Sequence, residues 1–401
     1  MALTFNQGKP PYPDLLVSDQ YQANSPQLGV AIETESHLYN APKRDFMRLF
    51  ILNLTLAALA GGPQGLLKAQ EAPKRHPHSL SRQGTVMGAP WQLTLGAQDR
   101  AAALIASETL VQALTEAELR LSNWNPNSEL SRWNQGRPGH ALPCSPILAN
   151  EVARADHWRP ITLGAFSPFS EPLVRAWDLR GAGRIPNPQE LTSALEACNS
   201  EGLTWQDGQP IRAEQTQVAS GGFGKGAALD FALAKLSLDD SHSVALNLGG
   251  QIIVRGLSQR IEIAHPEHRT ESIAHWVISE GSLATSGNSE RSKTVGDTKF
   301  GHILDARTGQ PALDFGSVTI WCDNALDADC LSTAFFALGP DEGLRVAATL
   351  PDVRVLFVEN NDGQLTLRAT KNCQPFLSST QTILWHFEPQ ALTSPIDFSK
   401  D

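Results

Sequence analysis

The sequence has no excess of positive charge. Its 401 residues include 32 lysines and arginines against 42 aspartates and glutamates, so the formal net charge is −10. Proteins that bind nucleic acids cluster basic residues against the phosphates, and this balance argues against such a function. The composition, 41% hydrophobic and 18% charged, is that of a globular protein. The length allows one large domain or two lobes.

Cysteines are also few, and they are widely spaced. The five are Cys144, Cys198, Cys322, Cys330 and Cys373. No two have the Cys-x-x-Cys spacing of structural zinc sites. An odd number of cysteines argues against a framework of disulfides.

The apolar run near the N-terminus, Leu49–Ala60, is too short to span a bilayer, which takes about 20 residues. It follows the basic residues Lys43, Arg44 and Arg48 and precedes small residues, which is the layout of an export signal. The stretch "KRDFM" resembles a twin-arginine signal with lysine in place of the first arginine, which fits a protein folded before export. The sequence therefore predicts a periplasmic protein with a signal over 43–72. The alternative is a buried core helix.

The signal divides the chain into segments, and no repeat of fixed period is present. Residues 1–42 are polar and contain proline, so they are an N-terminal extension or follow a mis-chosen start. Residues 73–82 are expected to be a linker. The main domain is expected over 83–388, with a C-terminal tail over 389–401.

Short strands in the main domain come in clusters, with helices between the clusters. Apolar residues at helical spacing predict a helix over 101–121, through Leu104, Leu110, Val111, Leu114, Ala117 and Leu121. Further helices are expected at 145–158, 226–236, 325–339 and 340–350, and strands at 84–98, 243–250, 251–256, 260–265, 353–359 and 364–370. Because strands and helices do not alternate strictly, the pattern favours an α+β fold with mainly antiparallel sheet.

A glycine-rich turn, "SGGFGKG" at 220–226, precedes a predicted helix. Such a turn exposes backbone N–H groups, and a helix N-terminus favours anions. Lys225 adds a positive charge. Ala219 and Gly226 rule out a Walker A loop, which has glycine and serine or threonine there. The alternative is a tight strand-to-helix turn, and the "LNLGGQ" stretch at 246–251 reads equally well as an ordinary bend.

Two polar loops, 283–291 and 301–311, place several functional residue types close together in the sequence: Ser286, His302, Asp305, Arg307 and Thr308. Downstream, Asp329 and Thr333 are four residues apart and so share one helix face. A carboxylate and a hydroxyl on one face suit magnesium, which takes few protein oxygens. The alternative is an acid that complements the dipole of its own helix.

Seven blocks occur in one order: "LSNWNPNSELSRWNQ", "GAFSPFSEPLV", "GGFGKGAALD", "LNLGGQIIVRG", "LATSGNSER", "GHILDARTGQPA" and "ADCLSTAFFALGP". Together they resemble the FAD:protein FMN transferases, the ApbE family, over about residues 82–358. The resemblance implies an exported enzyme that binds FAD and Mg2+ and moves FMN onto a Ser or Thr hydroxyl of a target flavoprotein, releasing AMP. It implies a partner within a membrane redox complex, and peripheral or no membrane contact after processing.

The same resemblance implies a fold and a set of site residues. The fold is α+β and related to the T-fold, with two related lobes of mainly antiparallel sheet and packed helices. Flavin and phosphate contacts are implied at Trp124, Ser128, Glu129, Ser131, Asn134, Gly222, Lys225, Thr285, Ser286, Gly287, His302, Asp305 and Arg307. Metal ligands are implied at Gly224, Asp329 and Thr333. Lys225 and magnesium could stabilise phosphoryl charge, and His302 or Asp329 could accept the proton of the hydroxyl.

The chain departs from the family pattern at several positions. Ser167, Ala219 and Gln251 stand where the family has acids, and Ser289 stands where it has an aromatic residue. These changes leave two alternatives to the transferase. One is a non-catalytic FAD-binding protein of the same fold, and the other is an FAD pyrophosphatase, which uses water as the acceptor.

Overall fold

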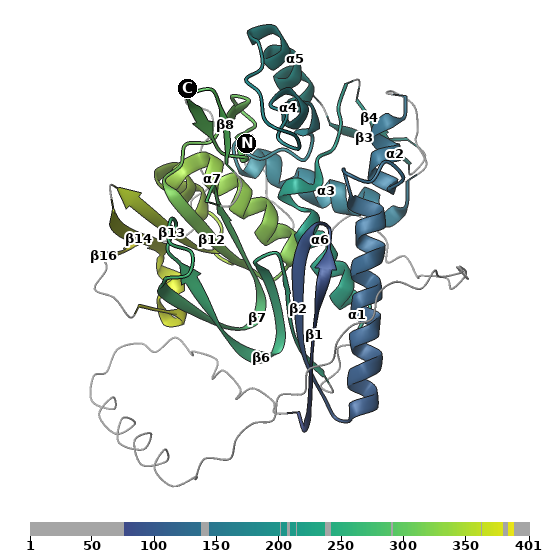
Figure 1. Cartoon of the computed structure of the whole chain (residues 1–401), viewed down its shortest axis with the longest axis vertical. Coiled ribbons are helices and arrows are strands. Elements are labelled where there is room, and N and C mark those ends of the chain that lie inside the picture. The colour runs from purple at the N-terminus through teal and green to yellow at the C-terminus, as the bar shows by residue number, and fades with distance from the viewer. Residues whose placement is uncertain are drawn as a thin grey trace, which may run out of the picture. The chain divides into compact units, whose positions relative to one another are not determined.

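The computed structural model of the chain describes residues 76–137, 144–200, 202–206, 209–213, 215–236, 242–289, 292–361, 363–379 and 384–388 (Figure 1). The predicted N-terminal extension, export signal and C-terminal tail lie outside these residues, as do residues 73–75 of the predicted linker. Within the described ranges, no helix is both long enough and apolar enough to cross a membrane.

Ten strands of the described chain form one sheet in the order β1-β2-β5-β6-β7-β12-β13-β14-β16, with β15 paired to β7. All neighbours are antiparallel except the pair β14–β16. The strands are β1 His78–Val86, β2 Ala89–Ala97, β5 His242–Leu248, β6 Gln251–Ala264, β7 Ser272–Gly287, β12 Gly316–Cys322, β13 Arg354–Asn361, β14 Gln364–Thr370, β15 Leu377–Ser378 and β16 Leu384–Glu388. Three two-stranded ribbons stand apart from this sheet: β3 Leu203–Gln206 with β4 Gln209–Arg212, β8 Lys293–Val295 with β9 Thr298–Phe300, and β10 Leu304–Asp305 with β11 Gln310–Pro311.

Helices pack against both halves of the sheet. They are α1 Arg100–Leu121, α2 Glu129–Gln135, α3 Pro146–Ile161, α4 Glu171–Ala176, α5 Pro188–Cys198, α6 Gly224–Ala234 and α7 Ala325–Ala347, with short 3-10 turns η1 Ser220–Gly222 and η2 Lys371–Phe376. Helix α1 contacts β1, β2 and α6, whereas α7 contacts β7 and β12 (Figure 1). The predicted α+β class with mainly antiparallel sheet is confirmed. The β6–β7 pair joins one half of the sheet, made of β1, β2, β5 and β6, to the other half, which begins with β7 and β12.

Strand β1 corrects one sequence interpretation. It begins at His78 and pairs with β2 along its whole length, from His78 opposite Ala97 to Val86 opposite Ala89. Residues 78–82, assigned to the linker from their polar composition, therefore belong to the sheet. The strand lies at the sheet edge and most of its side chains are exposed or half-buried, so a polar sequence suits it.

Helix α1 is confirmed, and most of its predicted apolar face is buried, with Leu104 as the exception. The side chain of Asp99 caps the helix by accepting a hydrogen bond from Ala102 N at 2.8 Å. Leu110 and Leu114 are buried, but Leu104 is 39% exposed.

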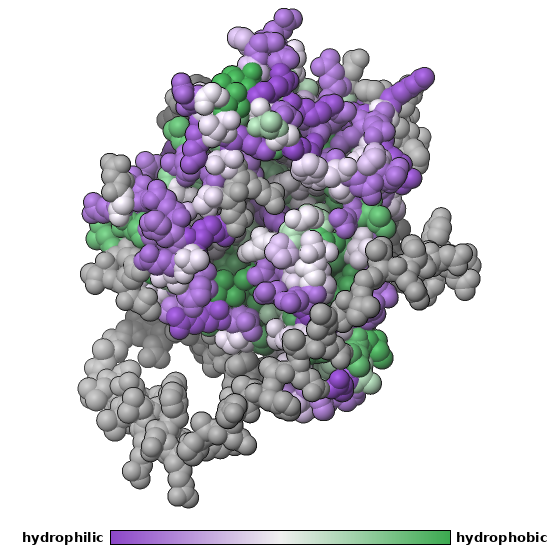
Figure 2. Space-filling model, in the orientation of Figure 1, coloured by the Kyte–Doolittle hydropathy of each residue, from purple (hydrophilic) through white to green (hydrophobic). Residues whose placement is uncertain are grey.

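Hydrophilic residues cover most of the coloured part of the molecular face in Figure 2, and hydrophobic residues are visible there in separate patches.

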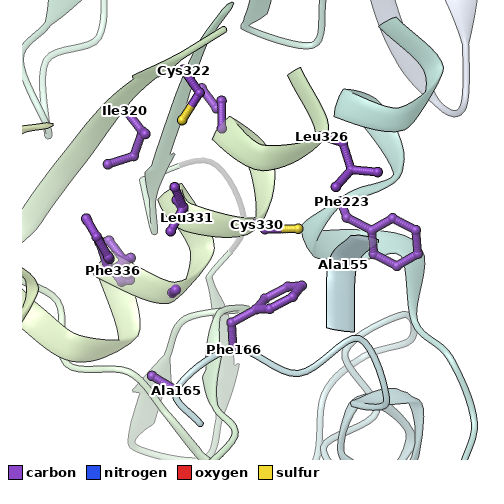
Figure 3. Close-up of a cluster of buried hydrophobic side chains, with 14 of the residues drawn as sticks. Ala155, Ala165, Phe166, Phe223, Ile320, Cys322, Leu326, Cys330, Leu331 and Phe336 are labelled. Carbon is purple, nitrogen blue, oxygen red and sulfur yellow. The ribbon is translucent and has the colours of Figure 1, made fainter. Parts of the chain in front are cut away.

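Helix α7 lies in the largest buried cluster and carries the predicted metal residues. Figure 3 shows residues from β12, α7 and neighbouring segments converging on it: Ala155, Ala165, Phe166, Phe223, Ile320, Cys322, Leu326, Cys330, Leu331 and Phe336. The first N–H groups of α7, at Ala325 and Leu326, are capped by the carboxylate of Asp230 from α6, at 2.7 and 3.1 Å. Gly339, with φ of 75°, kinks the helix between the two predicted helical segments.

The five cysteines all lie in the described ranges, and all are free. Four of them are buried, and Cys144 is half-buried. Burial raises the pKa of the Cys144, Cys198 and Cys373 thiols to about 11. Burial also raises the pKa of Cys322 and Cys330 well above the usual value.

A buried ion pair joins α1 to α3, and its removal is expected to destabilise the fold. Arg120 donates to Glu151 at 2.8 and 2.7 Å, and the two side chains are 7% and 8% exposed. Glu151→Gln leaves a buried guanidinium uncompensated, so the free energy of unfolding should fall by about 3–5 kcal/mol in urea titrations at pH 7. The matched control is Glu108→Gln at the more exposed Arg82–Glu108 pair, where less than about 1 kcal/mol is expected. Equal losses in the two variants would contradict this assignment.

Candidate functional site

A cavity of about 780 Å³ lies where the glycine-rich turn, the end of β7 and α7 meet. Many of the predicted site residues line it: Gly222, Lys225, Thr285, Ser286, Gly287, His302, Asp329 and Thr333. They come from four separate stretches of sequence, which the antiparallel sheet and α7 bring together. The structure thus places the predicted phosphate turn, the predicted metal residues and His302 around one space.

Asp329 lies at the centre of this arrangement. It is 3% exposed, its Oδ1 accepts from Lys225 Nζ at 3.0 Å, and its Oδ2 accepts from Gly226 N at 3.0 Å. Asp329 therefore stabilises the N-terminus of α6 and not that of its own helix, where Asp327 occupies the first turn. This close approach requires glycine at 226, because a Cβ there would lie 2.2 Å from the carbonyl oxygen of Ala325.

Hydroxyl groups surround the same turn of α7. The hydroxyls of Thr333 and Ser332 both donate to Asp329 O, at 3.1 and 3.0 Å. Ser286 Oγ, on the cavity wall, donates to Ser332 Oγ at 2.9 Å. Because the Thr333 hydrogen is directed at a carbonyl, the lone pairs of its oxygen remain available to a ligand in the cavity.

The donors around Asp329 fit a magnesium ion. A buried carboxylate and a threonine hydroxyl are hard oxygen ligands, and magnesium needs only one or two carboxylates from the protein. Across the described residues, no group of three or more His, Cys, Asp and Glu side chains could hold a metal. Gly224, the predicted carbonyl ligand, begins α6 but is not among the residues that line the cavity.

The loop at 122–134, predicted to contact the flavin, supports the glycine-rich turn. Asn134 forms two hydrogen bonds with the backbone of Val218, donating to its O and accepting from its N, both at 2.8 Å. Asn123, which sequence reasoning missed, accepts from Ser220 N at 2.7 Å and donates to Val218 O at 2.9 Å. These bonds fix the backbone that enters the turn carrying Lys225.

The other predicted residues of that loop also lie outside the cavity lining. Ser128 and Ser131 both donate to Ser122 O, at 2.5 and 2.9 Å, and Glu129 accepts from Ser145 Oγ at 3.0 Å. Trp124 is also absent from the lining, but it is 72% exposed, so its side chain is accessible to a ligand at the surface. Its ring lies 5.9 Å from the Arg180 guanidinium.

Asp305 and Arg307 form a pair beside the His302 loop. Arg307 donates to Asp305 at 2.8 Å and to Glu342 at 2.7 Å, and hydrogen bonding to these carboxylates raises the pKa of Arg307. Neither residue lines the cavity, although Ile303, Leu304 and Ala306 do. The structure therefore gives the pair a supporting position, tied to α7 through Glu342.

The residues that depart from the pattern implied by the resemblance are neutral. Ser167, Ala219 and Gln251 are buried, whereas Ser289 is exposed. Ser167 donates to Cys198 O at 3.2 Å, and Gln251 donates to Ala325 O at 2.7 Å. Ser167, Ala219 and Ser289 line the cavity, whereas Gln251 is buried beside it. Among the described lining residues, carboxylates are found at Glu262 and Asp329 alone. The cavity consequently suits an anionic ligand held near Lys225.

One wall of the cavity was not predicted as part of the site. The far end of β6 and the turn that leads from it to β7 contribute Arg260–Pro266 and Arg269 to the lining. Sequence reasoning treated these segments as plain strands. The register of the β6–β7 pair shifts between Arg255 and Gln259, next to Gly256 with φ of 71°, and such irregularities bend a hairpin. A glycine inside a strand was the available signal.

Variants of Asn134 and Trp124 distinguish a residue that supports the glycine-rich turn from a residue that contacts a ligand. Asn134→Ala leaves buried backbone groups of Val218 without partners, so the free energy of unfolding should fall by about 1–3 kcal/mol. Trp124→Ala should leave stability unchanged but weaken FAD binding by about 1–3 kcal/mol, the value of stacking on an exposed aromatic ring. Thermal unfolding and fluorescence titration would measure the two effects. A stability loss confined to Trp124→Ala would reverse the assignment.

Comparisons with known proteins agree on one family. A family model described as the ApbE family matches residues 87–357. The chain is 27% identical over 327 residues to the FAD:protein FMN transferase of Vibrio cholerae, covering 78% of this chain and 96% of the relative. It is 29% identical over 279 residues to the FAD:protein FMN transferase of Treponema pallidum, covering 63% and 76%. The ApbE protein structure from Thermotoga maritima aligns with a TM-score of 0.68 at 23% identity, covering 75% of this chain and 99% of that one.

Proposed function

Because the chain belongs to the ApbE family, we propose that it is a magnesium-dependent FAD:protein FMN transferase. The observation that carries the proposal is the buried Asp329 carboxylate, bonded to Lys225 and to the N-terminus of α6 in a cavity of about 780 Å³. The names of the relatives in Vibrio cholerae and Treponema pallidum support the same activity. The proposed acceptor is a flavin-carrying subunit of a membrane redox complex.

The proposed reaction is a phosphoryl-group transfer. The hydroxyl oxygen of an acceptor Ser or Thr attacks the phosphorus of the FMN half of FAD. The bond from that phosphorus to the bridging oxygen breaks, and AMP leaves with the electron pair. Lys225 stabilises the negative charge that builds up on the phosphoryl oxygens. Gly226 N already donates to Asp329 Oδ2, so α6 can add only the N–H groups that precede Gly226.

The structure favours His302 over Asp329 as the proton acceptor. Both carboxylate oxygens of Asp329 already accept hydrogen bonds, from Lys225 and Gly226, so neither oxygen is free to accept the proton of an attacking hydroxyl. His302 lines the same cavity. In the proposal it takes the proton of the attacking hydroxyl.

The residues that would hold magnesium are Asp329 and Thr333, which line the cavity; the carbonyl of Gly224, implied by the resemblance, is not part of that lining. When bound, the ion would supply positive charge to the phosphoryl oxygens. Ser167, Ala219 and Gln251, where the family has acids, make no hydrogen bond to Lys225 or Asp329 among the described contacts. Their neutrality is the observation that favours the alternative of a non-catalytic FAD-binding protein. It leaves the pair of Lys225 and Asp329 intact.

The proposal is tested by incubating the protein with FAD, Mg2+ and candidate acceptor flavoproteins. A transferase yields covalent flavin on the acceptor, seen as in-gel fluorescence, and one AMP for each flavin attached. Free FMN and AMP without any acceptor would identify an FAD pyrophosphatase. FAD binding without AMP release under all conditions would identify a non-catalytic flavin-binding protein and reject the transferase.

We also propose that the chain is exported to the periplasm and loses the signal over 43–72. The mature N-terminus should lie between about Ala60, where the signal layout ends, and His78, because β1 begins there and pairs with Ala97. Mass spectrometry of the protein from a periplasmic fraction measures this. Recovery of an intact chain beginning at Met1 in the cytoplasm would reject the proposal.

A further inference from the structure

The ammonium group of Lys225 covers one oxygen of the carboxylate assigned to the cation. Asp329 Oδ2 accepts a hydrogen bond from the backbone N–H of Gly226 at 3.0 Å, so Oδ1 is the oxygen that a movement of side chains alone could free for a cation. Lys225 Nζ lies 3.0 Å from that Oδ1. The Asp329 side chain is 5% exposed and that of Lys225 is 31% exposed, and both residues line the cavity.

Two cations cannot share this oxygen at low energy. Like charges at such short range repel strongly where water is excluded. A buried carboxylate left without a positive partner is also unfavourable. Asp329 therefore binds either Lys225 or a metal ion well, and each partner makes the other unnecessary.

We propose that Lys225 is an internal counter-ion that keeps the cation site of Asp329 closed until a diphosphate enters the cavity. The diphosphate draws the ammonium away from Oδ1, and the cation takes its place. This inference rests on the proposed function, because it takes FAD as the diphosphate and Mg2+ as the cation. It assigns Lys225 a role in the order of binding, beyond the stabilisation of phosphoryl charge.

The surroundings of Lys225 leave room for this movement. Its stem runs beside the Gly249–Gly250 turn, where a Cβ added at Gly249 would lie 3.6 Å from Lys225 Cδ. Nothing lies within 4 Å of a Cβ added at Gly221 or Gly250, and both glycines line the cavity. The four-carbon stem of lysine can therefore swing between the carboxylate and a ligand in the cavity without moving the backbone.

The displacement of Lys225 makes the binding of the diphosphate and the binding of the cation cooperative. If the diphosphate strengthens cation binding, then the cation must strengthen diphosphate binding by the same factor. Without FAD the protein should bind Mg2+ weakly, since the ion must displace Lys225 unaided. The cation is then recruited together with the substrate whose phosphates it contacts.

The test measures Mn2+ binding by electron paramagnetic resonance, because Mn2+ prefers the same oxygen ligands as Mg2+. Purified full-length protein is titrated with and without FAD. Lys225→Met should bind Mn2+ about 10-fold to 100-fold more tightly than the original chain in the absence of FAD, the usual range of a coupling between sites. Adding FAD should then strengthen Mn2+ binding much less than in the original chain. The control is Lys235→Met, at the end of the same helix, where the lysine pairs with exposed Glu116 at 3.7 Å.

Thermal unfolding gives a second readout that does not depend on activity. Lys225→Met leaves Asp329 buried without a counter-ion, so its melting temperature should be low without metal and should rise sharply with Mn2+. The original chain and Lys235→Met should respond little to Mn2+ alone. Should Lys225→Met fail to fold, Lys225→Gln retains a hydrogen-bond donor without the charge and is expected to show the same gain in Mn2+ affinity.

The outcomes separate this inference from the proposed function. If the Lys225 variants bind Mn2+ no more tightly than the original chain, while Asp329→Asn abolishes binding, the inference is wrong and the cation site stands. If Asp329→Asn leaves Mn2+ binding unchanged, the ion binds elsewhere and both are rejected. Tighter binding in the Lys225 variants, lost again in the double variant with Asp329→Asn, supports both.

Discussion

Asp329→Asn is expected to reduce AMP release from FAD by about 1,000-fold, because the proposed cation supplies several kcal/mol of transition-state stabilisation. Asparagine keeps the shape of the side chain but removes the charge that holds both the cation and Lys225. The rate should also become insensitive to Mg2+ concentration. Steady-state assays of AMP release across a Mg2+ titration would measure both effects.

The same variant is expected to be less stable, which requires a control. Asp329 bonds Lys225 and Gly226 N, so its loss should lower the free energy of unfolding by about 1–3 kcal/mol. Asp327→Asn is matched to it, because Asp327 lies on the same helix and bonds Trp158 Nε1 at 2.9 Å. That variant should also lose stability, but it should keep AMP release and its Mg2+ dependence. Wild-type turnover by a folded Asp329→Asn protein would reject the assigned cation site.

His302→Gln is expected to lower the rate of FMN transfer by about 100-fold to 10,000-fold, the contribution of a positioned general base. Glutamine has a similar size and keeps polar contacts, so FAD affinity should change by less than about 5-fold, a difference of under 1 kcal/mol. In the original chain the rate should fall at acidic pH, because a protonated imidazole cannot accept a proton. In the variant this acidic limb should disappear.

A second histidine provides the control for His302. His268→Gln changes a histidine of the β6–β7 hairpin that packs on His265 at 4.8 Å and is not among the cavity-lining residues. It should retain the rate and its pH profile. Loss of FAD affinity in His302→Gln together with an unchanged pH profile would assign His302 to binding and leave the proton acceptor to another group.

Local patterns in the sequence predicted much of the fold. Alternating polar and apolar residues marked strand β2 and the two strands of the β13–β14 hairpin, all of which form, whereas most of β1 was missed. The spacing of Asp329 and Thr333 placed them on one face of α7, where they lie in the same cavity. Helix α5 was missed, although the sequence contains a signal for its start. Asn187 and Glu190 form a capping box there, with Pro188 between them in the first turn.

The remaining parts of the site depend on contacts between distant residues, which spacing along the chain does not encode. The amide of Asn134 bonds Val218, 84 residues away, and Lys225 meets Asp329 across 104 residues. Asn134 lies in helix α2, and nothing in its local sequence indicates that its amide bonds a distant segment. Its use as a clamp on another segment becomes visible only when the two segments are packed together.

The buried thiols described above bear on the export proposed for this chain. A thiol with a pKa of about 11 is ionised to only about one part in 10,000 at pH 7, roughly a hundred times less than an ordinary cysteine, and the thiolate is the form that oxidants attack. In an oxidising compartment, where unfolded chains acquire disulfides, such cysteines remain reduced only while the fold is intact. A chain that crossed the membrane unfolded would expose all five at once, so transport in the folded state would protect it from mispaired disulfides.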